Sequence, residues 1–175
     1  MKHLFFLSFP LTLFLVIGVS ITALALPLLS SSPIRNTNLI FVFLLLYVLF
    51  NESGRVVWIA FASHALRELF STTPFGIILA AGTLSILFSY WTLRYIFTNR
   101  SWYTAAVMSI MSISLYRILY VLLLLIYNSI VKNTTHWRKE NFTQIGWEIL
   151  MTTFVVTLCY TTILYGKKWM RGYSS

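Results

Sequence analysis

Apolar runs long enough to cross a lipid bilayer constrain this 175-residue chain more than any other feature. A helix that spans the hydrocarbon core needs about 20 consecutive apolar residues, and such runs alternate with short polar breaks along the chain. The composition agrees, because 58% of the residues are hydrophobic and 10% are charged, whereas a soluble domain carries about 25% charged residues. The sequence therefore predicts an all-α integral membrane protein with a single membrane domain over residues 1–175.

The polar breaks predict six transmembrane helices. The second apolar run has only about 12 residues, roughly 18 Å of helix, so it must extend into flanking polar residues or be covered by protein instead of lipid. The first run has a basic start and an Ala23-Leu24-Ala25 sequence, as in a cleaved signal peptide. Its length of about 26 residues favours an uncut first helix instead. The predicted spans are residues 4–29, 39–50, 55–70, 76–97, 103–131 and 142–165.

The net charge of +9 arises from 13 Lys and Arg residues against four acidic residues, all of them Glu. Basic loops on the cytoplasmic side and contacts with anionic lipid headgroups account for such an excess. No segment is long enough to form a soluble basic module, so no nucleic-acid partner is expected. Six spans place both termini on one side of the membrane, and a small Lys and Arg bias predicts that this side is cytoplasmic.

The third apolar run carries His64, Arg67, Glu68 and Ser71 at spacings that place them on one helix face. Ionisable residues at membrane depth are costly and normally face the protein interior. Two interpretations follow. Either Arg67 and Glu68 extend to the headgroups from the end of the helix, or this face is a buried polar seam against other helices.

Two more ionisable residues lie within later spans, Arg117 near the middle of the fifth and Glu148 in the sixth. Together with Arg67 and Glu68 their charges sum to zero. We therefore expect a neutral polar cluster that joins the third, fifth and sixth spans, although the sequence does not indicate which residues pair. Pro74 and Gly76 predict a turn between the third and fourth spans.

Small and hydroxyl residues recur three or four positions apart in two spans and would let helices approach closely. Background usage of small residues is the alternative explanation. The two sets are Ala105, Ser109 and Ser112 in the fifth span, and Thr153, Thr157 and Thr161 in the sixth.

Catalytic motifs are absent from the sequence. There is no Asp, no closely spaced pair of carboxylates and no Gly-rich phosphate-binding loop. His3, His64 and His136 are far apart, so they do not predict a metal site. We expect a protein that is not an enzyme and that binds no metal or cofactor.

Residues 36–125 resemble the MreD family of bacterial rod-shape-determining membrane proteins. The resemblance rests on the order of several elements: a short Leu-rich span (NLIFVFLLLYVLF), a Gly-containing break (NESGR), the motif ELFSTTPFG from Glu68 to Gly76, and a loop with Arg and Trp (TNRSW). The family motif is close to D-L-x-S-G-x-P-x-G, so Glu68 replaces Asp and Thr72 replaces Gly. Arg117, after Tyr116, replaces an acidic residue found in many members.

This resemblance implies a non-catalytic scaffold subunit of the cell-elongation machinery, which synthesises peptidoglycan, in the bacterial cytoplasmic membrane. Its partner would be an MreC-like single-span protein, and through it the wall-synthesis glycosyltransferase and transpeptidase. The implied fold is also similar to the substrate-binding S-components of ECF vitamin transporters, which provide the main alternative function. An S-component usually has an A-x-x-x-A contact motif in its first helix, and residues 4–29 lack one.

Overall fold

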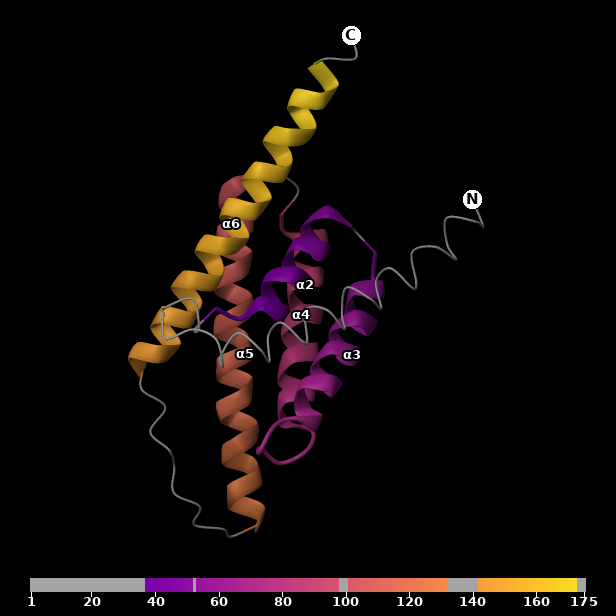
Figure 1. Ribbon diagram of the computed structural model, residues 1–175. Helices are drawn as coiled ribbons and strands as arrows, with labels where there is room; N and C mark the ends of the chain where they lie inside the picture. Colours follow the sequence, from indigo (N-terminus) through magenta and orange to yellow (C-terminus); the bar gives the residue numbers. More distant parts are fainter. Residues whose placement is uncertain (1–36, 52, 98–100, 132–141, 173–175) are drawn as a thin grey trace.

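The computed structural model describes residues 37–51, 53–97, 101–131 and 142–172, and within these ranges every regular element is a helix (Figure 1). The predicted span at residues 4–29 lies outside the described residues, as do Ala23 and Ala25. The helices are α2 (Leu39–Phe50), α3 (Arg55–Leu69), α4 (Ile77–Tyr95), α5 (Trp102–Val131) and α6 (Phe142–Gly172).

The helices begin and end close to the predicted positions, because the polar breaks stop each apolar run. The largest difference is at α6, which continues past Tyr165 to Gly172. The other difference that affects the site is at α3, which ends at Leu69, so Ser71 belongs to the following turn. In Figure 1, α5 runs past the turn that joins α3 to α4.

Three of the described helices are long and apolar enough to cross a membrane: α4, α5 and the part of α6 between Thr143 and Gly166. The chain is therefore a helical membrane protein. Six crossing helices are not supported, because α2 has 12 residues and α3 has 15, whereas a crossing needs about 20. The described part of the chain thus combines three helices of membrane-crossing length with two shorter ones.

The short helix α2 lies in the interior of the bundle. It contacts α3, α4, α5 and α6, and residues on all its sides are buried, among them Phe41, Leu44, Leu45 and Val48. Of the two possibilities that the sequence left open for this run, burial by protein is the one that the structure has. A helix that is apolar all round is expected to be surrounded by other helices.

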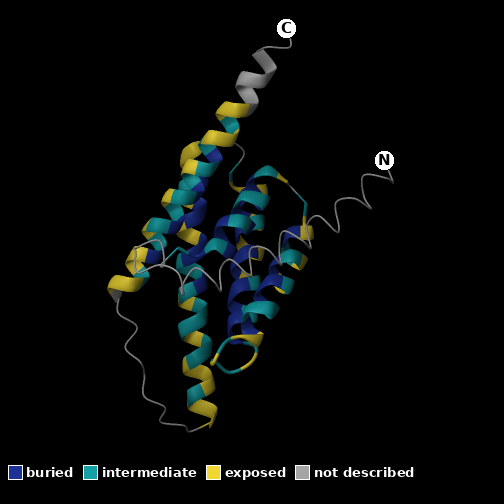
Figure 2. Ribbon diagram, viewed as in Figure 1, coloured by how far each residue is buried: buried dark blue, intermediate teal, exposed yellow. Residues whose placement is uncertain are grey.

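Buried residues concentrate where α2, α4 and the first half of α5 meet (Figure 2). Ala105, Ser109 and Ser112 are fully buried on α5, which packs on α4 and α6, so this set of small residues lies in the interior. The set on α6 is different, because Thr153, Thr157 and Thr161 are only half-buried. The hydroxyls of Thr157 and Thr161 donate hydrogen bonds to backbone carbonyls in the preceding turn of the same helix.

Candidate functional site

The clearest polar contact between helices joins Arg117 on α5 to Glu148 on α6. The Nε of Arg117 donates a hydrogen bond to Oε2 of Glu148 at 2.8 Å, and Nη2 contacts the same oxygen. The Glu148 side chain is 8% exposed and that of Arg117 is 24% exposed. An unpaired charge is costly in such surroundings, so separation of the two side chains is unfavourable. The ion pair therefore determines which sides of α5 and α6 face each other.

Asn38 extends this contact to the start of α2. Its side-chain Nδ2 donates a hydrogen bond to Oε1 of Glu148 at 3.1 Å. Its backbone N–H donates to Oγ1 of Thr152, one turn further along α6, also at 3.1 Å. Glu148 therefore binds groups from two helices at once, and the N-terminus of α2 is attached to α6.

Glu68 has a different partner, the N-terminus of α4. Its Oε1 accepts hydrogen bonds from the backbone N–H groups of Gly76 and Ile78 at 2.7 and 3.2 Å, and its Oε2 accepts one from Leu79 at 3.2 Å. The first N–H groups of a helix lack partners within the helix and favour a negative charge. Glu68 at the end of α3 thus caps the next helix and closes the turn between them.

Gly76 makes this cap possible through its backbone conformation. Its φ is +100°, in the left-handed region that other residues rarely adopt. This conformation directs the chain into α4 while the Gly76 N–H faces Glu68. The predicted turn role of Gly76 therefore has a specific geometric cause.

His64 lies in an aromatic and apolar environment at the centre of the bundle. It is fully buried, its ring stacks on Tyr116 at 6.2 Å between centroids, and Phe41 is 5.5 Å away. Gly82 on α4 faces the same ring, so closely that a Cβ there would lie 2.4 Å from the imidazole. Neither ring nitrogen has a hydrogen-bond partner among the described residues, so His64 packs as an aromatic side chain between α2, α3, α4 and α5.

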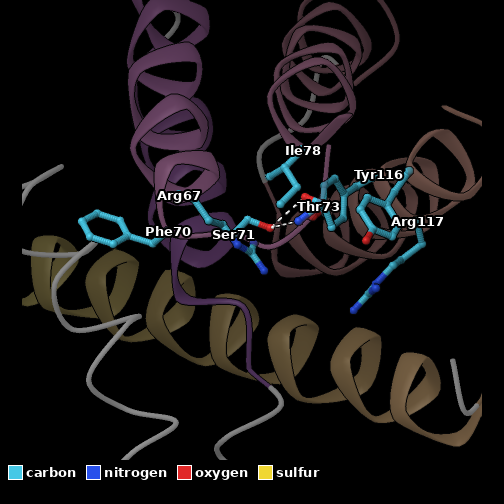
Figure 3. A pocket seen from close by; sticks show the side chains of 8 residues that line it. Arg67, Phe70, Ser71, Thr73, Ile78, Tyr116 and Arg117 are labelled. Atoms are coloured by element: carbon cyan, nitrogen blue, oxygen red, sulfur yellow. Dashed lines mark hydrogen bonds between the residues drawn. The ribbon is translucent and has the colours of Figure 1, made fainter. Parts of the chain in front are cut away.

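Arg67 and Arg117 line the same pocket between α3, the following turn, α4 and α5. The volume of the pocket is about 300 Å³. Figure 3 shows both guanidinium groups reaching toward one side of it, with the Ser71 and Thr73 hydroxyls, 2.7 Å apart, between the two helices. Two further polar side chains, Tyr116 and Tyr120, and two apolar ones, Phe70 and Ile78, complete the lining.

The expected polar cluster is therefore divided into two parts. Arg117 and Glu148 do pair, but Glu68 bonds to backbone amides of α4 and not to an arginine, so the four charges do not form one network. The physical reason is that the α3–α4 turn returns the chain directly over Glu68, which brings three N–H groups to its carboxylate. Arg67 and Ser71, the other i, i+4 pair of the predicted polar face, line the pocket instead.

Three residues with structural roles in this region were not singled out from the sequence: Asn38, Thr152 and Gly82. Asn38 has the position of a helix N-cap directly before an apolar run, and Thr152 is four residues after Glu148, so both carried a local signal. Gly82 carried none, because its closeness to His64 depends on how α3 packs on α4.

The described residues hold no group of three or more His, Cys, Asp or Glu side chains that could bind a metal ion. The polar groups described above instead bind one another across helices or line the pocket between Arg67 and Arg117. This arrangement defines a helical membrane protein with two polar sites in its interior, one where α2, α5 and α6 meet and one between α3, α4 and α5.

Comparisons with known proteins add no relative. No protein-family model matches the chain, no curated protein matches it, and no solved structure matches it.

Proposed function

We propose that this protein is a non-catalytic membrane scaffold of the MreD type that binds an MreC-like single-span protein through its transmembrane helices. In this proposal the protein lies in the bacterial cytoplasmic membrane with both termini in the cytoplasm, and acts in the peptidoglycan-synthesis machinery of cell elongation. The resemblance of residues 36–125 supports the family, and the all-helical bundle is compatible with it.

The observation that carries the proposal is the outer surface of α6. Only 17% of the membrane-length part of this helix is buried, compared with 22% for α5 and 50% for α4. Leu150, Phe154 and Leu158 are exposed at intervals of four residues, directly beside the half-buried Thr157. A row of small hydroxyl residues flanked by large apolar ones lets another helix approach closely in a bilayer.

The internal contacts of α6 explain how this surface is held in place. Its opposite side carries Glu148 and Thr152, which bind Arg117 and Asn38. The same side buries Val156 and Tyr160 against the core. Because the polar and apolar contacts on that side fix the rotation of α6, Leu150, Phe154 and Leu158 face away from the bundle, and the half-buried Thr157 lies at the edge of this exposed surface.

The test is co-purification of the full chain with a single-span MreC-like protein. Thr157→Phe places a bulky ring in the row of small residues and is expected to reduce recovery of the partner. Thr162→Phe is the matched control, because Thr162 is exposed on α6 and lies about 140° around the helix from Thr157. Equal recovery with both variants, at unchanged melting temperatures, would contradict a partner surface at Thr157.

One observation favours the alternative function, the substrate-binding subunit of an ECF-type vitamin transporter. Such a subunit needs a pocket in which several polar groups converge, and the pocket between Arg67 and Arg117 is one. A rise in melting temperature on addition of a vitamin would support this function, and co-purification of the single-span protein would support the scaffold.

A further inference from the structure

The pocket between Arg67 and Arg117 is lined by an arginine that has an unsatisfied hydrogen-bond donor. Nη1 of Arg67 is buried and has no hydrogen-bond partner among the described residues. A buried donor that lacks a partner is destabilising, and more so when it belongs to a charged group. Arg67, which also lines the pocket, therefore carries a guanidinium donor that no described protein group satisfies.

The second arginine is held at the pocket by Glu148. The carboxylate binds Nε and Nη2 of Arg117, and this two-point contact orients the planar guanidinium while Arg117 also lines the pocket wall. Arg67 comes from α3 and Arg117 from α5, so the two positive groups face one space from separate helices (Figure 3). Such convergence favours a ligand with negative charge.

The two carboxylates in the described part of the chain do not provide this charge to Arg67. Glu68 uses both oxygens on the N–H groups of α4, and Glu148 uses both oxygens on Arg117 and Asn38. The hydroxyls of Ser71 and Thr73, which bond to each other, add neutral polar groups at the pocket wall. The wall thus contains two guanidiniums and several hydroxyls.

We propose that this pocket binds a phosphate-bearing group, with Arg67 from α3 and Arg117 from α5 contacting its oxygens and the hydroxyls of Ser71 and Thr73 near it. Arginine suits phosphate because its planar donors match two phosphate oxygens at once. A volume of about 300 Å³ is sufficient for a headgroup or a small anion. Phe70 and Ile78 give the same pocket an apolar side, on which the chain of a lipid would pack.

Two sources of the phosphate are distinguished by binding measurements on the purified full chain in neutral detergent. The probes are dioctanoyl phosphatidic acid, dioctanoylglycerol, which has the same chains without the phosphate, and inorganic phosphate, and the readouts are calorimetric affinity and melting temperature. Saturation by phosphatidic acid alone assigns the pocket to a lipid headgroup, and saturation by inorganic phosphate assigns it to a soluble anion. Absence of binding by all probes, or equal affinity for phosphatidic acid and dioctanoylglycerol, overturns the proposal.

Variants that remove the positive charge of one arginine test whether the probe binds in this pocket. Arg67→Gln is expected to weaken the affinity about tenfold or more, because it removes hydrogen bonds to a charged group. Arg55→Gln is its control, since Arg55 is exposed at the start of the same helix. If both variants bind the probe as the wild type does, Arg67 does not contact the ligand and the proposal fails.

A second pair of variants keeps the test decisive if Arg67→Gln is unstable. Thr73→Glu places a carboxylate at the pocket wall, where it would bind Arg67 and exclude an anion. Thr72→Glu adds the same charge at the neighbouring exposed position, which does not line the pocket. Loss of binding in Thr73→Glu with binding retained in Thr72→Glu supports the proposal, and equal binding by the two variants contradicts it.

The inference does not depend on the scaffold function. Failure of phosphate binding would leave partner recovery through α6 unchanged, and loss of the partner in Thr157→Phe would leave the affinity for phosphate unchanged.

Discussion

Arg117 at the middle of α5 forms an ion pair with Glu148, which lies 31 positions later on α6. The carboxylate also accepts a hydrogen bond from Asn38, 110 positions earlier in the chain. These contacts make Glu148 the polar centre of the junction between α2, α5 and α6, and they determine which charge reversals the protein can tolerate.

Reversal of Glu148 to Lys places two positive charges together in the interior, so we expect Glu148→Lys to prevent stable accumulation in the membrane. Arg117→Glu in the same chain restores opposite charges and should partly recover accumulation. The recovery is measured as the monodisperse fraction of the chain in detergent.

The control for this exchange is Glu68. Glu68→Lys should also prevent accumulation, but Arg117→Glu should not rescue it, because Glu68 binds the backbone of α4 and not Arg117. Equal rescue of both reversals would show that the arginine pairs with neither carboxylate specifically.

The cap on α4 predicts a smaller effect from a neutral substitution at the same site. Glu68→Gln keeps one acceptor oxygen but loses the charge, and we expect it to destabilise the fold by about 1–2 kcal/mol, the usual range for a helix cap. The measurement is the melting temperature in detergent. Thr72→Ala, in the exposed part of the same turn, should leave that temperature within error of the wild type.

The left-handed conformation of Gly76 predicts a cost for any side chain there. Gly76→Ala should destabilise by about 1–2 kcal/mol, because a Cβ strains the backbone at positive φ. Steric contact is not the cause, since nothing lies within 4 Å of the position that a Cβ would take.

Gly146 on α6 provides the comparison for Gly76. A Cβ at Gly146 also meets nothing within 4 Å, but its backbone is helical. Gly146→Ala should therefore be neutral or stabilise by about 0.5–1 kcal/mol. If both alanines melt at the same temperature, conformational strain at Gly76 is not important for the fold.

The contact between His64 and Gly82 predicts coupling between two substitutions. Gly82→Ala should destabilise by about 1–3 kcal/mol, because its Cβ would lie 2.4 Å from the imidazole. His64→Ala should destabilise by about 2–4 kcal/mol through the cavity that it leaves. Since the added methyl then has room, the double variant should be less destabilised than the sum of the two single changes. Additive losses in melting temperature would argue against this contact.

The sequence predicted the positions of the five described helices well, because each apolar run ends at a polar break that cannot enter a bilayer. It predicted less well which of them cross a membrane. Six apolar runs suggested six crossings, but α2 and α3 are too short, and α2 is covered by other helices. Local composition cannot distinguish an apolar helix buried in protein from one that faces lipid.

For the polar residues, too, the sequence predicted one part of the arrangement and tertiary packing decided the other. Spacing alone placed His64 and Glu68 on one side of α3, and Arg67 four residues from Ser71, because helical geometry depends only on position in the chain. Tertiary packing decided that Glu68 caps α4, that Arg117 pairs with Glu148, that Gly82 admits the His64 ring, and that Arg67 faces a pocket. These outcomes depend on the rotation of each helix relative to its neighbours, and that rotation is fixed by contacts between residues far apart in the sequence.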